Sequence, residues 1–474
     1  MKKRLLLSLV LAAICSLGRA QPPAELTAIL DQTLDDMRAS LGAKGLGAAI
    51  QLPDNEIWTG ASGISSVNPT VNVATDDAFL IGSVTKTITS ACILQLVDEG
   101  VLALEDSLGK WLDTLPAIDP NGYINRKITI RQLLRHQSGI YDVLSHPNNQ
   151  TTLLSDISKI WTPEELIAEF ISPPLFAPGA TWSYSNTNYF LLGMIVKKVT
   201  GKPFYQAFRE RFFEPLDLQT IAIPAFEPLL PPVAHVWLDI TGDGVTDDAH
   251  DFYMSYLALN STAGAAGGYF STPRDIAEWL STYLRGDLVS ATNMAQAKTT
   301  VVAPGQPITY GLGLMRKTFL GLEAFGHGGD LAYAASAWYF PAKDISIVVM
   351  TNDSKKNSWT LIPTVTALLK SYMDWSMPTA VGEHLKTENW VMEVFPNPFS
   401  EVLAVSIEFP VDADNVQLTL TDPLSRRVET IQRNDLPMGK TLFEFDHLNQ
   451  LPSGIYFVSA QVNGQYVRTV KVAK

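Results

Sequence analysis

The chain has 474 residues, of which 46% are hydrophobic and 18% are charged, a composition that excludes a disordered protein and allows two or more domains. Its formal net charge of −13 argues against nucleic acid and anionic membrane surfaces as partners. One of the two cysteines, Cys15, lies in an N-terminal apolar run, which leaves Cys92 alone in a mature chain. No disulfide framework is therefore expected.

The N-terminus has the layout of a secretory signal peptide. Basic residues 2–4 precede an apolar run over residues 5–17, and Ala20 offers a small residue for cleavage. We therefore expect residues 1–20 to be a signal peptide that exports the chain. No later stretch is a better candidate for a bilayer span, so no transmembrane anchor is expected.

Residues 21–376 show helix and strand patterns at both ends and helical patterns between them. Apolar residues at helical spacing predict a first helix over 25–41, followed by strands at 47–52 and 57–63. Strand character returns at 310–318, 335–339 and 345–350, before a final helix at 359–375. The middle is mainly helical, with helices expected at 128–135, 163–171, 189–199 and 273–284. This order predicts an α+β body whose sheet joins distant parts of the chain.

The periodicity fades over residues 377–390, which we interpret as a linker. Past it, apolar and polar residues alternate in short runs separated by Pro, Gly, Asn and Asp. The expected strands are 402–409, 416–421, 442–445, 455–460 and 466–472. Residues 391–474 are thus predicted to form a small all-β sandwich.

One stretch of the body, residues 78–97, is apolar except for a single charge, Lys86. Ser83 precedes this lysine by three positions, so a helix would bring the hydroxyl and the amine together on one face. Apolar surroundings disfavour the ammonium and predict a pKa for Lys86 that falls from ~10.4 to near 7. A neutral amine beside a hydroxyl is a base beside a nucleophile. The alternative is a core helix whose lysine reaches the surface.

Two further segments give this pair a context: Tyr184-Ser-Asn186 and His327-Gly-Gly329. Together with Ser83-Val-Thr-Lys86, and in this order, they resemble the class C β-lactamase-like serine hydrolases. That family includes β-lactamases, D-alanyl-D-alanine peptidases, D-amino-acid peptidases and esterases. The flanking residues 128–139, 178–186 and 310–314 are also similar to the family. The resemblance implies an antiparallel sheet flanked by helices plus a helical subdomain, as in β-lactamases and transpeptidases.

The resemblance implies that Ser83 is the acylated nucleophile, with Lys86 and Tyr184 as its catalytic partners. Which of the two is the working base stays open, because a tyrosine becomes a useful base only when a nearby cation lowers its pKa. Asn186 is expected to bind substrate amide or carbonyl groups, or to cap the following helix. His136 is expected to brace the helix and loop beneath the site.

The segment from His327 to Asp330 is expected to form a strand edge that faces Ser83. Gly328 and Gly329 would let a substrate approach the backbone, and the N–H groups of Asp330 and Ser83 would form an oxyanion hole. The β-lactamases proper have a lysine where this chain has His327. A histidine of pKa ~6.5 supplies that charge only in part, which favours a peptidase or an esterase; the alternative is a structural strand histidine.

The C-terminal segment is similar to a different family. Phe395-Pro-Asn-Pro-Phe399, residues 416–422, Gly454-Ile-Tyr456 and residues 468–474 resemble the C-terminal sorting domain of the type IX secretion system. The resemblance implies that residues 391–474 engage the type IX secretion machinery and that the protein is secreted or held at the cell surface. The alternative is a carbohydrate-binding or adhesive sandwich.

Asp239, Asp243 and Asp247 are spaced like the first ligands of a calcium loop, but His250 stands where the closing carboxylate belongs. An Asp- and Gly-rich turn is the favoured interpretation. The chain has no H-E-x-x-H pair or Cys/His cluster, so we expect no metal and no cofactor.

These patterns predict an exported serine hydrolase that forms an acyl-enzyme at Ser83. Its expected substrates are small molecules or peptides with an amide or ester bond, such as a D-amino-acid peptide, a β-lactam or a small ester. The rival hypothesis is a catalytically silent peptidoglycan-recognition or surface-binding module on the same fold.

Overall fold

A computed structural model describes residues 22–376, 391–409, 412–422, 426–463 and 465–474. The chain falls into two compact units that divide between Lys370 and Ser371. The predicted signal peptide and the predicted linker, residues 377–390, lie outside the described residues. No helix in the described part of the chain is both long enough and apolar enough to cross a membrane.

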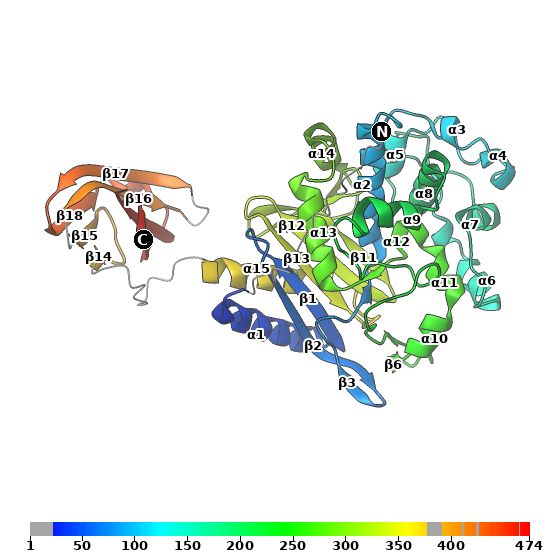
Figure 1. The fold of residues 1–474 in the computed structure, drawn as a ribbon, viewed down its shortest axis with the longest axis horizontal. Coiled ribbons are helices and arrows are strands. Elements are labelled where there is room, and N and C mark those ends of the chain that lie inside the picture. The colour runs from blue at the N-terminus through cyan, green and yellow to red at the C-terminus, as the bar shows by residue number, and fades with distance from the viewer. Residues whose placement is uncertain (1–21, 377–390, 410–411, 423–425, 464) are drawn as a thin grey trace, which may run out of the picture. The chain divides into compact units, whose positions relative to one another are not determined.

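The first unit is built on one nine-stranded antiparallel sheet (Figure 1). Its order is β3-β2-β1-β13-β12-β11-β10-β9-β8. The pairing of β1 with β13, with Leu46 opposite Thr351, joins the two ends of the body as the sequence predicts. The strands are β1 (Gly45–Gln51), β2 (Ile57–Val67), β3 (Thr70–Asn72), β8 (Val301–Val302), β9 (Thr309–Tyr310), β10 (Met315–Phe319), β11 (Leu322–Leu331), β12 (Tyr333–Phe340) and β13 (Ile345–Thr351).

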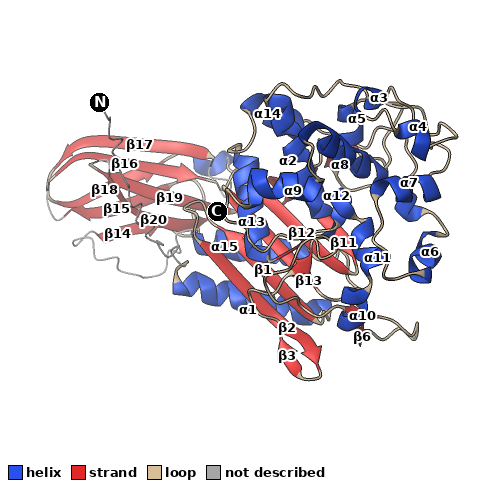
Figure 2. Ribbon diagram, turned by 45° about the vertical axis from the view of Figure 1, so that its right-hand side comes forward, coloured by secondary structure: helices blue, strands red, loops and turns tan. Residues whose placement is uncertain are grey.

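Helices cover both faces of this sheet, as Figure 2 shows. A Cβ on Gly47 would meet Pro273, the first residue of α13 (Pro273–Arg285). Gly60 of β2 pairs with the residue of β1 that follows Gly47, so it faces the opposite side of the sheet. A Cβ on Gly60 would meet Leu34 of α1 (Ala24–Leu41). With both faces covered, every residue of β1, β12 and β13 is buried.

Local signals explain where these helices begin and end. The side chain of Thr272 accepts a hydrogen bond from the N–H of Asp275, Pro273 opens α13, and Gly286 ends it at φ 99°. Gly42 ends α1 in the same left-handed conformation, at φ 60°. The last helix, α15 (Ile362–Ser376), begins in the first unit and extends past its boundary at Lys370.

The helical subdomain lies between β3 and β8 in the chain and packs around α2 (Thr85–Asp98), which contacts α8 (Thr187–Thr200) and α12 (Gly264–Gly267). Its other helices are α3 (Leu108–Trp111), α4 (Leu115–Ile118), α5 (Ile130–Leu134), α6 (Asn149–Ser155), α7 (Pro163–Phe170), α9 (Phe204–Phe208), α10 (His250–Ser255), α11 (Leu257–Thr262) and α14 (Ala291–Lys298). The same part of the chain contains two short strand pairs: β4 (Phe79–Leu80) with β7 (Phe270–Ser271), and β5 (Trp237–Leu238) with β6 (Asp247–Asp248). The predicted α+β fold with an antiparallel sheet and a helical subdomain is confirmed.

The prediction of a single strand over 310–318 is wrong, because a turn divides this segment into β9 and β10. The N–H of Gly311 donates to the carbonyl of Leu314, and Gly313 adopts φ 71°. A Cβ on Gly313 would lie 3.0 Å from the carbonyl oxygen of Lys86. The turn therefore presses against the helix that carries Lys86, a tertiary reason that an alternating pattern does not reveal.

The second unit contains two small antiparallel sheets, as the predicted all-β fold requires. One has the order β14-β15-β18 and the other β17-β16-β19-β20. Apolar residues of both sheets, among them Val405 and Leu418, form one core. The strands are β14 (Val391–Phe395), β15 (Leu403–Phe409), β16 (Ala413–Thr421), β17 (Arg427–Leu436), β18 (Gly439–Phe445), β19 (Ile455–Val462) and β20 (Gln465–Ala473).

Strand β17 was not expected, because it is a largely polar strand that buries none of its residues fully.

The Pro-Asn-Pro motif binds the last strand of the unit. Asn397 accepts a hydrogen bond from the N–H of Ala473 at 2.8 Å, and Phe399 donates its N–H to the carbonyl of Ala473 at 2.8 Å. The first segment of the unit thus fixes its last strand.

Candidate active site

Ser83 and Lys86 meet at the start of α2, as the sequence predicts. Ser83 lies in a 3₁₀ turn, Gly82–Val84, that leads directly into the helix. Lys86 Nζ is 2.9 Å from Ser83 Oγ. Ser83 is partly exposed whereas Lys86 is buried, so the amine reaches the hydroxyl from the interior of the protein.

The contacts of Lys86 define where its lone pair points. Its Nζ lies 2.7 Å from Asn186 Oδ1 and 2.7 Å from the carbonyl oxygen of Ala266, two groups that only accept. A neutral amine has two N–H bonds for these acceptors, which leaves its lone pair for the Ser83 hydroxyl. Burial lowers the pKa of Lys86 to about 7, although the charge of Asp142 opposes this shift. The direction of this shift agrees with the fall expected from the apolar sequence around Lys86.

Tyr184 reaches the same hydroxyl from the loop before α8. Its Oη is 2.9 Å from Ser83 Oγ, and Lys86 Nζ lies 4.9 Å from the centre of its ring. Burial raises the pKa of Tyr184 well above 10, with only the hydrogen bond to Ser83 acting in the opposite direction among the main causes. The lowered pKa that Tyr184 would need in order to act as a base is therefore absent, and the phenol keeps its proton.

Asn186 immediately precedes α8 but makes no capping hydrogen bond with its side chain, so the capping alternative is wrong. Its Oδ1 accepts from Lys86, and its Nδ2 donates to Asp142 Oδ2 at 2.9 Å. The amide is thus committed to groups of the protein on both sides. The expected contact of this amide with substrate stays a prediction.

The segment from His327 to Asp330 lies on β11, beside the nucleophile. The pairing of β10 with β11 begins at Gly326, so the following residues of β11 are free of β10. A Cβ on Gly329 would lie 2.0 Å from the carbonyl oxygen of Ile81 and 2.9 Å from the amide nitrogen of Ser83. A Cβ on Gly82 would lie 2.8 Å from the amide nitrogen of Asp330. These two glycines bring the two predicted oxyanion donors close together.

His327 is buried, and both of its ring nitrogens have partners in the protein. Nδ1 is 2.5 Å from the carbonyl oxygen of Gly328, so it carries the proton, and Nε2 is 2.8 Å from the hydroxyl of Tyr310. Burial lowers the pKa of His327 to about 3. The expected partial positive charge is therefore wrong: this histidine is neutral where β-lactamases proper have a lysine.

Tyr310 also connects His327 to His136. His136 Nδ1 accepts the N–H of Ser185 at 3.1 Å, so its Nε2 carries the proton and donates to the hydroxyl of Tyr310 at 3.2 Å. The His136 ring also stacks on Tyr184, with centroids 4.2 Å apart. The bracing contacts predicted for His136 are present, and they hold the loop of Tyr184 from beneath.

Sequence reasoning missed several groups that hold this arrangement. Asp142 binds Asn186, the carbonyl of Ala266 binds Lys86, and the carboxylate of Asp330 accepts the Ser358 hydroxyl at 2.7 Å. Tyr310 was part of a family-like segment, but nothing in the sequence pointed to its hydroxyl. A backbone carbonyl such as that of Ala266 leaves no trace in side-chain spacing.

The Asp239 loop forms a turn that is closed by the side chain of Asp239. The carboxylate of Asp239 accepts the N–H groups of Gly242 and Gly244 at 2.7 and 2.9 Å, which fits the favoured turn interpretation. Among the described residues, no group of three or more His, Cys, Asp or Glu side chains could hold a metal ion.

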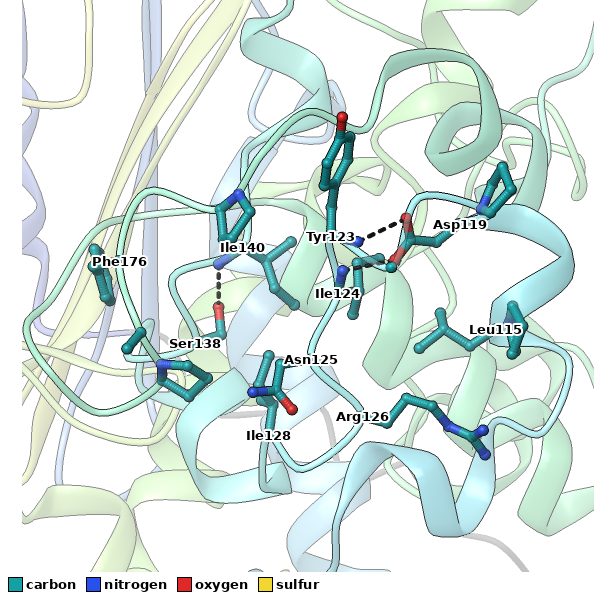
Figure 3. A pocket seen from close by; sticks show the side chains of 16 residues that line it. Leu115, Asp119, Tyr123, Ile124, Asn125, Arg126, Ile128, Ser138, Ile140 and Phe176 are labelled. Atoms are coloured by element: carbon teal, nitrogen blue, oxygen red, sulfur yellow. Dashed lines mark hydrogen bonds between the residues drawn. The ribbon is translucent and has the colours of Figure 1, made fainter.

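A cavity of about 830 Å³ lies elsewhere in the helical subdomain (Figure 3). None of the predicted site residues lines it. Ser138 on its wall donates to Asn188 at 2.6 Å, and Asn188 contacts His136, so the cavity adjoins the supports of the site. Its apolar lining includes Leu115, Tyr123, Ile124, Ile128, Ile140 and Phe176.

Comparison with known proteins gives two family matches and several relatives. The beta-lactamase family profile matches residues 30–368, and that of the secretion system C-terminal sorting domain matches residues 393–473. The D-alanyl-D-alanine-carboxypeptidase/endopeptidase AmpH of Escherichia coli K12 is 26% identical over 386 residues, covering 75% of this chain and 92% of the relative.

Two solved structures are also similar to the chain. A D-stereospecific amidohydrolase from Streptomyces is 32% identical, with a TM-score of 0.59 over 69% of this chain and 94% of the other. D-amino acid amidase from Ochrobactrum anthropi SV3 is 25% identical, with a TM-score of 0.63 over 74% of this chain and 100% of the other. The chain therefore belongs to the beta-lactamase family of serine hydrolases and carries a C-terminal secretion sorting domain.

Proposed function

We propose that this protein is an exported serine hydrolase that is acylated at Ser83 by an amide or ester of a D-amino acid. The observation that carries the proposal is the pair of 2.9 Å contacts from Ser83 Oγ to Lys86 Nζ and Tyr184 Oη. A hydroxyl between a buried neutral amine and a phenol is an activated nucleophile with a proton donor beside it.

In this mechanism Lys86 is the working base. Its lone pair takes the proton of the Ser83 hydroxyl while Oγ attacks the carbonyl carbon of the substrate. The negative charge that develops on the carbonyl oxygen is stabilised by the N–H groups of Ser83 and Asp330. Tyr184, which keeps its proton in the resting site, donates it to the leaving amine or alkoxide and recovers a proton from Lys86. Water then releases the acyl group by the reverse path.

The neutral His327 supports a substrate without a carboxylate at that position. A lysine would favour the carboxylate of a β-lactam or of a free peptide C-terminus, but a buried imidazole whose nitrogens are both occupied offers no charge. D-amino acid amides and esters meet this condition. The similarity to the D-stereospecific amidohydrolase and to D-amino acid amidase supports the same substrate class.

The C-terminal unit supports export to the cell surface or beyond. Because residues 393–473 match a secretion sorting domain, we propose that residues 391–474 deliver the hydrolase through the type IX machinery after residues 1–20 have directed it to the periplasm. The predicted boundaries, with a hydrolase over 21–376 and a linker over 377–390, remain part of this proposal.

A substrate panel tests the proposed activity. The full-length protein and its Ser83→Ala variant would be assayed with D-phenylalanine p-nitroanilide, its L enantiomer, p-nitrophenyl butyrate, D-alanyl-D-alanine and nitrocefin. We expect Ser83-dependent hydrolysis that is faster for the D-amide or the ester than for nitrocefin. Nitrocefin as the best substrate would contradict the substrate class, and equal rates for the two proteins would support the silent binding module.

A further inference from the structure

Asp142 lies behind the active site and binds it through Asn186. It caps a 3₁₀ turn, Val143–Ser145, where its Oδ1 accepts the N–H of Leu144 at 3.2 Å. Its Oδ2 accepts Nδ2 of Asn186 at 2.9 Å. Burial raises the pKa of Asp142, whereas the two N–H donors that face its carboxylate oxygens oppose this shift and favour the ionised form.

This contact determines which way the Asn186 amide points. An ionised carboxylate only accepts hydrogen bonds, so the amide must turn its Nδ2 toward Asp142 and its Oδ1 toward Lys86. With the amide reversed, an NH₂ group would face the amine and compete for its lone pair. The orientation imposed by Asp142 therefore keeps that lone pair available to Ser83.

We propose that Asp142 is a positioning residue that acts on Lys86 through Asn186, by orienting the amide and by compensating the charge that Lys86 gains during acylation. This role rests on the proposed function, in which Lys86 takes the proton of Ser83. As that proton moves, a buried ammonium forms, and Asn186 links it by two hydrogen bonds to the negative charge of Asp142.

The histidines and tyrosines around Lys86 are uncharged at neutral pH. Burial lowers the pKa of His136 and His327 and raises the pKa of Tyr184 and Tyr189. The carboxylate of Asp330 is bound to Ser358. Asp142 is the acidic group that raises the pKa of Lys86 against the effect of burial.

The test measures how fast a fluorophosphonate labels Ser83 as a function of pH. In this reaction the bond from Ser83 Oγ to phosphorus forms, fluoride leaves, and Lys86 takes the proton. The rate should rise through the pKa of Lys86, because only the neutral amine accepts that proton. Asp142→Asn keeps an acceptor for the Asn186 amide but removes the charge, so the rise should move down by about 0.5–1 pH unit.

Two further variants test the role of Asp142 beyond the single Asp142→Asn exchange. Asp142→Ala frees the amide to turn, and labelling should slow about 10- to 100-fold at every pH. The double exchange Asp142→Asn with Asn186→Asp places the carboxylate directly against Lys86, and the rise should move to higher pH. Asp119→Asn is the matched control: Asp119 is also buried in the helical subdomain, where it accepts the N–H groups of Tyr123 and Ile124, and its profile should match the wild type.

The outcomes separate this inference from the function on which it rests. If the wild-type protein is not labelled, or if Ser83→Ala is labelled equally, the proposed function itself fails. If the wild type is labelled through Ser83 but Asp142→Asn and the double exchange both superimpose on its pH profile, the role of Asp142 is refuted while the hydrolase stands.

Discussion

Lys86 is placed where its charge is unfavourable, and this placement explains its chemistry. The side chain is fully buried, and two of its three polar contacts are to obligate acceptors. Burial lowers its pKa to about 7, so the folded protein holds a base that an exposed lysine would not provide at neutral pH. A group tuned in this way lowers the stability of the fold that contains it.

We therefore expect the stability of the protein relative to a Lys86→Met variant to depend on pH. The folded pKa of about 7 lies below the unfolded value of ~10.4, so between these limits the unfolded chain binds more protons and stability rises with pH. The free energy of unfolding of the wild type should gain about 1.4 kcal/mol per pH unit on the variant between pH 7 and 10. Denaturant titrations at several pH values measure this; a constant difference would contradict the buried neutral lysine.

The hydroxyl of Tyr310 lies between two buried histidines and contacts both. Tyr310→Phe would leave Nε2 of His327 without its donor and the Nε2 proton of His136 without its acceptor. We expect a loss of about 1–3 kcal/mol in the free energy of unfolding. Tyr283→Phe is the matched control, because that buried hydroxyl makes a longer contact of 3.4 Å with Ser90. Equal losses for the two variants in urea unfolding would contradict the role of the His-Tyr-His chain.

For individual residues, the sequence predicted that Ser83 and Lys86 meet, because residues three positions apart lie on one face of a helix. It could not predict the neutral state of His327, which depends on Tyr310 and on the carbonyl of Gly328. It also gave Asn186 a capping role that suits its position, whereas the fold directs its side chain to Lys86 and Asp142. For both residues the outcome depends on at least one partner that is distant in the sequence.

Among the elements, the edge of β11 and the turn that carries Ser83 make the closest approach in the site. Gly329 has no Cβ, and this allows its backbone to lie against the carbonyl of Ile81. The strand edge was expected from the resemblance of His327-Gly-Gly329 to a family motif, but the turn between β9 and β10 was not expected, since its cause is contact with α2. Alternation of apolar and polar residues along a strand indicates which side chains are buried, but it does not indicate which other element they contact.

We expect Gly329→Ala to inactivate the protein while leaving it folded. The added Cβ would lie 2.0 Å from the carbonyl oxygen of Ile81, so β11 must move away from the 3₁₀ turn and the two predicted oxyanion donors must separate. Loss of one such donor reduces turnover about 10²–10³-fold. Gly454→Ala, with open space around its Cβ, is the control. Ser83 labelling and thermal unfolding measured together decide the matter: unchanged labelling of folded Gly329→Ala would refute the assignment.

For the molecule as a whole, the two units have separate apolar cores and separate family matches. The composition shift after residue 376 predicted the all-β unit, although the polar strand β17 gave no signal of its own. The hydrogen bonds of Asn397 to Lys471 and Ala473 tie the motif at the start of this unit to its last strand.

Removal of residues 391–474 should separate export from hydrolysis. The active-site residues all belong to the first unit, so the shortened protein should keep its Ser83 labelling rate while its release from the periplasm is lost. Cell fractionation of a strain that expresses either form measures delivery, and Ser83→Ala in the full-length chain is the control for activity alone. Normal surface delivery of the shortened protein would contradict the sorting role.

The central claim, that buried neutral Lys86 activates Ser83, is tested most directly by the pH dependence of Ser83 labelling in the wild-type protein. Intact mass and peptide mapping after reaction with a fluorophosphonate would locate the adduct and give its rate at each pH. The adduct should form on Ser83, be absent in Ser83→Ala, and form at half its maximal rate near pH 7. A rate that still rises steeply above pH 9, or an adduct at another residue, would contradict it.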